Sequence, residues 1–165
     1  MSRFKVFVYG TLKTNEPNHH WLSNTENGNS NYLGEGTTLQ KYPLIIGTQY
    51  NIPFLLDKPG VGNNVIGEVY DIDEKMLLNL DILEDYPKFY ERSVIPIKMK
   101  TEVLDCWTYF IKRYNAELLS KEMFPSYSTK GPHNLPYCER YLRDPSYNYK
   151  LEILGTGRSD FRRSK

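Results

Sequence analysis

The chain has 165 residues, which is the size of a single domain. Its 39% hydrophobic and 25% charged residues argue against an intrinsically disordered chain and against a membrane protein. The 21 basic and 20 acidic residues leave a net charge of +1, which gives no support for a nucleic-acid or membrane partner. With two cysteines, no signal-peptide-like start and no apolar run of bilayer length, the sequence predicts a reduced, cytoplasmic protein.

Short runs of alternating apolar, β-branched and aromatic residues recur along the chain and are typical of strands. The first run ends abruptly at Gly10, and turn residues bound the others. A loop rich in Asn, Gly and Ser is expected over residues 25–31, and short helices are expected near residues 18–22 and 115–124. In chain order, the predicted strands cover residues 4–9, 42–46, 52–56, 65–72, 90–98 and 104–112.

One long helix is predicted over residues 73–84, where Asp73 can cap the first turn and Pro87 forces an end. Several strands with one strong helix indicate an α+β fold, in which a strongly curled or closed sheet has its helices outside. Residues 1–143 are expected to form this single domain. Residues 144–165 are irregular with a basic end, so they are expected to form a loosely held tail.

Glu84 is a carboxylate on the face of this helix that should meet the core. At about 100° per residue, Glu84 projects from the same face as an apolar stripe, and Asp81 lies at the border of that stripe. A buried carboxylate is costly unless it is paired or functional, and burial raises its pKa toward the range of a proton shuttle. The alternative is a last-turn glutamate that reaches solvent where the helix frays. The stripe consists of Met76, Leu77, Leu80 and Leu83.

A second candidate is the segment Tyr9, Gly10, Thr11 and Leu12, at the end of the first predicted strand. A strand that stops at glycine exposes successive backbone N–H groups, and such a nest can hold an anionic oxygen or a carboxylate. The hydroxyl of Thr11 offers one more donor. An ordinary strand-ending turn is the alternative interpretation.

Motifs for other chemistries are not found in the sequence. His19 and His20 are adjacent and cannot share a helix face, and no Cys/His spacing typical of zinc occurs, so we expect no metal site. Cys106 falls in a predicted strand and is expected to be a core residue. A nucleophilic pair of Cys138 with His133 stays open but nothing favours it. The sequence also has no serine-hydrolase elbow and no P-loop.

Several short motifs, taken in their order and spacing, point to one known family. They are VFVYGTLK at residues 6–13, PNH at 17–19, YPL at 42–44, NIPFLL at 51–56, GEVY at 67–70, DEKML at 73–77, LDILE at 80–84 and GPH at 131–133. On these residues, the chain resembles the gamma-glutamylcyclotransferase superfamily, and within it the gamma-glutamylamine branch. The resemblance covers residues 4–138, and the chain departs from the family pattern after residue 144.

The resemblance implies a small barrel-like mixed sheet flanked by helices. It also implies an enzyme that releases an amine from a small gamma-glutamyl amide while the glutamyl part cyclises to 5-oxoproline, without metal or cofactor. For the gamma-glutamylamine branch, the implied substrate is L-gamma-glutamyl-epsilon-lysine, which is left when transglutaminase-crosslinked proteins are degraded. The family's binding loop corresponds to Tyr9, Gly10, Thr11 and Leu12, and its catalytic glutamate corresponds to Glu84.

Two alternatives remain at this point. The same fold accepts other gamma-glutamyl amino acids or glutathione, whose leaving group would favour an Arg or Lys at the pocket mouth, with Arg92 as the candidate. A binding module that holds a small acid without turnover is the second, because a fold does not fix a function. The sequence predicts no nucleic-acid or membrane partner, and it leaves the oligomeric state open.

Overall fold

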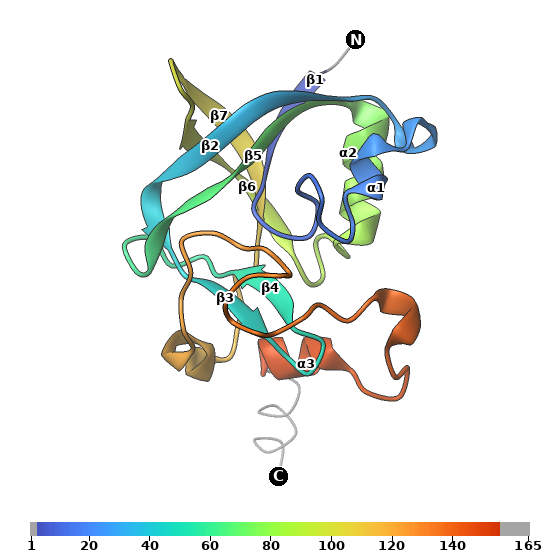
Figure 1. Ribbon diagram of the computed structural model, residues 1–165, viewed down its shortest axis with the longest axis vertical. Coiled ribbons are helices and arrows are strands. Elements are labelled where there is room, and N and C mark those ends of the chain that lie inside the picture. The colour runs from blue at the N-terminus through green and yellow to red at the C-terminus, as the bar shows by residue number, and fades with distance from the viewer. Residues whose placement is uncertain (1–2, 156–165) are drawn as a thin grey trace.

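Five strands close into a barrel in the computed structural model, which describes residues 3–155 (Figure 1). Their order around the barrel is β1-β5-β2-β6-β7, and neighbouring strands run antiparallel until β7 meets β1. That last pair is parallel, with Val6 opposite Trp107, and it closes the sheet. The strands are β1 (Arg3–Val8), β2 (Ser30–Tyr42), β5 (Asn63–Asp73), β6 (Glu91–Lys98) and β7 (Val103–Phe110).

A hairpin of two short strands continues the structure beyond one end of β7. Leu56, just after this hairpin, forms a parallel bridge to Ile111, and the Ile111 N–H donates to the carbonyl of Leu55 at 2.9 Å. The helices lie outside the barrel (Figure 1). These elements are β3 (Leu44–Gly47), β4 (Ile52–Leu55), α1 (His20–Ser23), α2 (Glu74–Leu83), α3 (Tyr149–Leu154) and the 3-10 turns η1 (Thr25–Asn27), η2 (Ala116–Ser120) and η3 (Arg140–Leu142).

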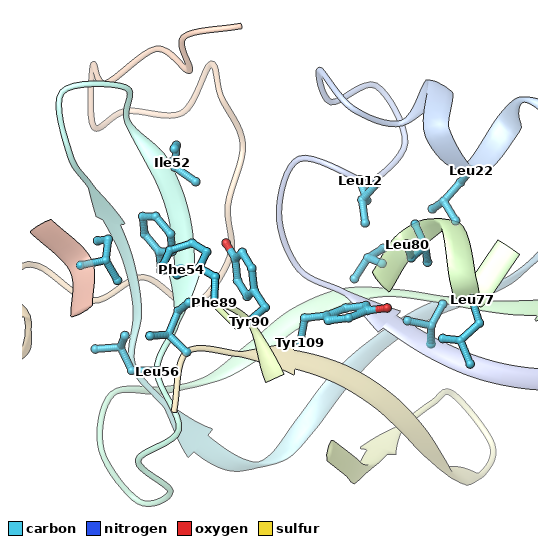
Figure 2. Packing of buried hydrophobic residues seen from close by; sticks show 14 of the residues in the cluster. Leu12, Leu22, Ile52, Phe54, Leu56, Leu77, Leu80, Phe89, Tyr90 and Tyr109 are labelled. Carbon is cyan, nitrogen blue, oxygen red and sulfur yellow. The ribbon is translucent and has the colours of Figure 1, made fainter. Parts of the chain in front are cut away.

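The two faces of strands β1, β5 and β7 contribute side chains to two separate apolar clusters. On β1, Phe7 belongs to one cluster, whereas Val6 and Val8 belong to the other, as the two-residue period of a strand requires. The second cluster joins the barrel to α2, to the β3–β4 hairpin and to the C-terminal segment. Figure 2 shows part of it, with Leu77 and Leu80 of α2 in view. The rigid base for any site next to β1 and α2 therefore comes from this cluster.

The α+β class, the closed mixed sheet and the predicted strands are confirmed, but β2 extends over residues that gave no strand signal. Before Tyr42, its buried positions carry Gly36 and Thr38 instead of large apolar residues. A Cβ on Gly36 would lie 2.5 Å from Ile97, so the barrel has no room there for a side chain. The β2–β5 register also shifts at two places, which removes the alternation on which strand prediction depends.

The C-terminal segment differs from the loosely held tail expected after residue 143. Residues 149–154 form α3, Asn148 caps it by accepting from the Lys150 N–H, and Ile153 is fully buried in the second cluster. The Asn115 N–H donates to the carbonyl of Ile153 at 2.7 Å. Ile153 is the one fully buried residue of this short helix, and a single buried position gives no helical period from which such packing could be predicted. The basic end, residues 156–165, lies outside the described residues.

None of the helices in residues 3–155 combines the length and the apolar character that a bilayer span requires.

Candidate active site

One cavity brings together the two segments that the sequence singled out. Its lining includes Gly10, Thr11 and Leu12 after β1, and Glu84 at the end of α2. Because these segments are more than seventy residues apart, the fold and not the local sequence places them together. The rest of the lining is rich in apolar and aromatic side chains. It comes from β1, β4, the end of α2, the turn before β6, β7 and the C-terminal segment: Phe7, Val8, Tyr9, Ile52, Pro53, Leu83, Phe89, Tyr90, Tyr109, Tyr137, Arg140, Arg143, Tyr149 and Lys150.

Helix α2 presents Glu84 to this cavity because its apolar stripe faces the core as predicted. Met76, Leu77 and Leu80 are buried, whereas Leu78 and Ile82 are exposed on the opposite side. Such an orientation fixes the direction of every side chain on the helix. The prediction of the helix and of its buried face is therefore confirmed, with Asp73 accepting a hydrogen bond from the Met76 N–H at 2.9 Å.

Glu84 is the C-cap of α2, and its N–H donates to the carbonyl of Leu80 at 2.9 Å. The next residue, Asp85, has a φ of 53° and turns the chain away from the helix axis. Among residues 3–155, the Glu84 carboxylate forms no ion pair. Burial raises the pKa of the Glu84 carboxyl to about 7 and nearby Asp81 adds to the rise, whereas Arg140 and Lys150 oppose it. A carboxyl with this pKa can both accept and return a proton near neutral pH.

The loop after β1 offers backbone donors to the cavity. Within the described residues, the N–H groups of Gly10, Thr11 and Leu12 donate no hydrogen bond, although all three residues line the cavity. Gly10 is needed for close approach, since a Cβ there would lie 2.9 Å from Cγ of Pro53 on β4. Successive free N–H groups are the feature that favours an anionic oxygen or a carboxylate.

Two residues, Asn18 and His19, hold this loop through polar contacts that no pattern in the sequence predicts. Asn18 is buried, its N–H donates to the carbonyl of Thr11 at 2.8 Å, and its Nδ2 donates to the Thr11 hydroxyl and to the Tyr137 hydroxyl, each at 3.0 Å. The Nδ1 atom of His19 lies 2.9 Å from the carbonyl of Leu12. Asn18 therefore links the loop to the C-terminal segment, and His19 has a structural contact in place of a ligand role.

Tyr9 and Asp81 belong to a buried polar network beside the cavity. The Tyr9 hydroxyl donates to the carbonyl of Tyr109 at 2.8 Å, and the Tyr109 hydroxyl donates to Asp81 at 2.6 Å. Burial, with the charge of Glu84 adding to it, raises the pKa of Tyr9 well above its usual value, so this hydroxyl stays protonated. The hydroxyl of Tyr9 therefore already has its hydrogen-bond acceptor within the protein.

Arg92 does not line the cavity, and the suggestion that it serves the pocket mouth is wrong. Its guanidinium makes two hydrogen bonds to Asp81, at 2.8 and 3.0 Å, and lies over the rings of Tyr86 and Trp107. This bidentate ion pair with Asp81 already neutralises the charge of the Arg92 guanidinium within the protein. The cations that line the cavity are Arg140, Arg143 and Lys150.

The remaining nucleophile and metal candidates have structural contacts. Cys106 is fully buried, as expected for a core residue. His133 bonds through one ring nitrogen to the carbonyl of Ser128 and through the other to the Leu135 N–H, so neither nitrogen is directed at Cys138. No cluster of three or more potential metal ligands occurs in residues 3–155. The cavity is thus lined by a carboxyl group with a raised pKa, by free backbone N–H donors and by cations.

Comparison of the chain with known protein families gives a match over most of its length. The family model described as gamma-glutamyl cyclotransferase, AIG2-like, matches residues 6–128. The chain belongs to this family. Its match includes both the loop after β1 and the helix that carries Glu84.

Individual relatives of this cyclotransferase-family chain extend over most of its length. A Drosophila melanogaster protein whose name assigns it only provisionally to the gamma-glutamylcyclotransferases is 51% identical over 146 residues, 86% of this chain and 90% of that protein. The mouse gamma-glutamylaminecyclotransferase is 37% identical over 84% of this chain and 98% of its own. A crystal structure of an AIG2-like protein from Mus musculus has a TM-score of 0.84 at 37% identity, covering 87% of this chain and all of the other. The fold and the enzyme class are thereby shown to be those of the cyclotransferases.

Proposed function

We propose that the protein is a gamma-glutamylamine cyclotransferase that converts L-gamma-glutamyl-epsilon-lysine into 5-oxoproline and free lysine, in the breakdown of transglutaminase crosslinks. The observation that carries the proposal is the meeting of Glu84 with the free N–H groups of Gly10, Thr11 and Leu12 in one cavity. Family membership and relatives named gamma-glutamylaminecyclotransferase support it.

The loop after β1 would hold the substrate by its alpha-carboxylate. Three backbone N–H groups can donate to the two carboxylate oxygens, and the loop is fixed by Asn18, so its ordering cost is already met by the fold. Held in this way, the glutamyl chain can fold until its alpha-amine lies against its own gamma-carbonyl carbon. Well-oriented intramolecular groups reach effective molarities of about 10⁵ M or more.

The reaction is then an internal aminolysis in which Glu84 carries the proton. The alpha-amine nitrogen bonds to the gamma-carbonyl carbon while Glu84 accepts a proton from that nitrogen. The bond from the same carbon to the lysine epsilon-nitrogen breaks as Glu84 returns the proton to the leaving nitrogen. The products are 5-oxoproline and lysine, no water is consumed, and Glu84 ends in its starting state.

The transient oxyanion on the gamma-carbonyl oxygen needs a donor as well. Tyr90 lines the cavity, and its hydroxyl makes only a long contact, 3.5 Å, to the carbonyl of Pro53. Burial raises the pKa of Tyr90 well above its usual value, so its proton is retained for donation. The Tyr90 hydroxyl and a loop N–H are the two donors that the cavity offers.

Turnover is tested by incubating the full chain with gamma-glutamyl-epsilon-lysine and measuring both products. The proposal expects 5-oxoproline and free lysine in equal amounts. Gamma-glutamylalanine and glutathione, assayed in parallel, test the two other substrates of the same fold. If no amide is turned over while 5-oxoproline still raises the melting temperature, the protein is a binding module and the proposal is wrong.

The pH profile gives a further expected result. Because Glu84 must be ionised to accept the first proton and burial raises its pKa to about 7, kcat/KM should fall as the pH drops below 7. This limb belongs to the free enzyme, so substrates with different leaving amines should share it. A profile of kcat/KM between about pH 5 and about pH 9 measures it, and a flat profile across neutrality would contradict the role of Glu84.

A further inference from the structure

The cavity holds more positive charge than the reaction itself explains. Three cationic side chains, Arg140, Arg143 and Lys150, line it together with a single carboxylate, Glu84. All three belong to the segment from η3 to α3, which the resemblance to the family did not cover. We refer to these three residues as the cationic wall.

Arg143 is held in place by the protein, and one of its nitrogen donors has no hydrogen-bond acceptor among the described residues. Its Nε donates to the carbonyl of Cys138 at 3.0 Å, and its guanidinium lies 5.1 to 5.3 Å from the ring centroids of Tyr50, Tyr137 and Tyr149. Its Nη2 atom is buried and has no hydrogen-bond partner within residues 3–155. A buried, unpaired guanidinium nitrogen is costly unless a ligand supplies the acceptor.

Arg140 and Lys150 differ in how far the protein already neutralises them. Lys150 donates to Asp85 at 2.9 Å. Arg140 is exposed and forms no ion pair among the described residues, yet it is the cation that most strongly opposes the raised pKa of Glu84. Arg140 therefore lies near the reacting carboxylate with its own charge unpaired.

The glutamyl half of the substrate does not need these cations, since the loop N–H groups serve its carboxylate and Glu84 serves its amine. We propose that the cationic wall is the subsite for the leaving amine and selects gamma-glutamyl amides whose leaving amine carries a carboxylate. This inference rests on the proposed function and adds the substrate class to it. An arginine can form charge-assisted, bidentate hydrogen bonds to a carboxylate. It therefore favours a leaving amine that carries a carboxylate over one that has a hydrogen atom in the same place.

Two matched substrate pairs isolate that carboxylate. Gamma-glutamyl-epsilon-lysine is compared with the gamma-glutamyl amide of 1,5-diaminopentane, which lacks only the carboxylate. Gamma-glutamylalanine is compared with gamma-glutamylethylamine in the same way for a short leaving group. We expect the wild-type chain to favour the carboxylate-bearing member of the pair that it turns over best by about tenfold or more in kcat/KM.

Arg140→Gln is the test variant, because an exposed side chain can be changed without loss of the fold. The expected result is a preference reduced by about fivefold, through a higher KM for the carboxylate-bearing amide and an unchanged KM for its partner. Assays at about pH 8.5 keep Glu84 ionised in both proteins. Arg113→Gln, at an exposed arginine outside the cavity, is the matched control and should change neither member of the pair.

Three results would overturn the subsite. One is a wild-type chain that turns over both members of each pair equally well, which leaves the proposed function intact and removes the selectivity. Another is an equal loss on both members in Arg140→Gln, which would make Arg140 a general positioning residue. The third is a wild-type chain that turns over no amide at all, since the proposed function then fails and takes the subsite with it.

Discussion

Glu84→Gln is expected to abolish the release of 5-oxoproline and to leave its binding nearly unchanged. The amide has the same shape as the carboxylate but cannot accept the proton of the attacking amine. General acid–base catalysis contributes about 10² to 10⁴-fold, and here one residue serves in both directions, so kcat should fall by about 10³-fold or more. Product formation under saturating substrate gives kcat, and the melting-temperature shift caused by 5-oxoproline reports binding.

Asp81→Asn is the matched control on the same helix, three residues earlier. Asp81 does not line the cavity and bonds Arg92 and Tyr109, so this change should cost stability but much less turnover. Near-normal turnover by Glu84→Gln would contradict the assignment of Glu84 as the group that carries the proton. If Asp81→Asn had the larger effect on kcat, the chemistry would belong to the other carboxylate.

Stability separates a functional Glu84 from a structural one. Its pKa is raised from 4.5 to about 7 on folding, so between these values the folded chain holds a proton that the unfolded chain has released. The free energy of unfolding therefore falls as the pH rises across this window, and the stabilising contribution of the bound proton is lost above about pH 7. Glu84→Gln should remove this slope and raise the melting temperature at alkaline pH, whereas a large fall would indicate a structural role.

Gly10→Ala is expected to lower kcat/KM by about 100-fold while the fold remains intact. The added Cβ would lie 2.9 Å from Cγ of Pro53, a ring held within β4, so the loop must move away from the hairpin. A shift of this kind misdirects the N–H groups that hold the alpha-carboxylate. We expect a kinetic assay to show the loss of activity and the circular-dichroism spectrum to be the same as that of the wild-type chain.

Pro53→Ala tests the cause of that loss, because it removes the atom against which the new methyl group packs. The double variant Gly10→Ala/Pro53→Ala should recover part of the activity that Gly10→Ala loses, beyond what Pro53→Ala alone predicts. Additive losses in this double-mutant cycle would mean that the two residues do not interact, and the role of close packing in placing the loop would be wrong.

The predictable part of the site came from local patterns. The apolar stripe of α2 predicts the direction of the Glu84 side chain, because residues four and seven positions apart lie on the same face of a helix. The glycine after β1 marks where the ladder stops and where N–H groups are left free. Each of these two signals consists of residues that lie close together along the chain, and the resemblance to the family used the same two segments.

The parts that the sequence did not predict depend on contacts between distant residues. Asn18 bonds Tyr137, which is 119 positions away, and Arg143 lies among tyrosines from two segments. No periodicity marks such residues in a stretch that is irregular until α3. The sequence suggests Arg92 as the cation for the leaving group, because nothing in it shows that Asp81 already neutralises this arginine.

A crystal structure of Glu84→Gln with gamma-glutamyl-epsilon-lysine tests the central claim most directly. The account predicts that the alpha-carboxylate accepts hydrogen bonds from the N–H groups of the loop between Tyr9 and Lys13, with the gamma-carbonyl carbon beside the amide at position 84. A ligand bound with its alpha-carboxylate away from that loop, or a side chain at position 84 turned into solvent, would contradict it.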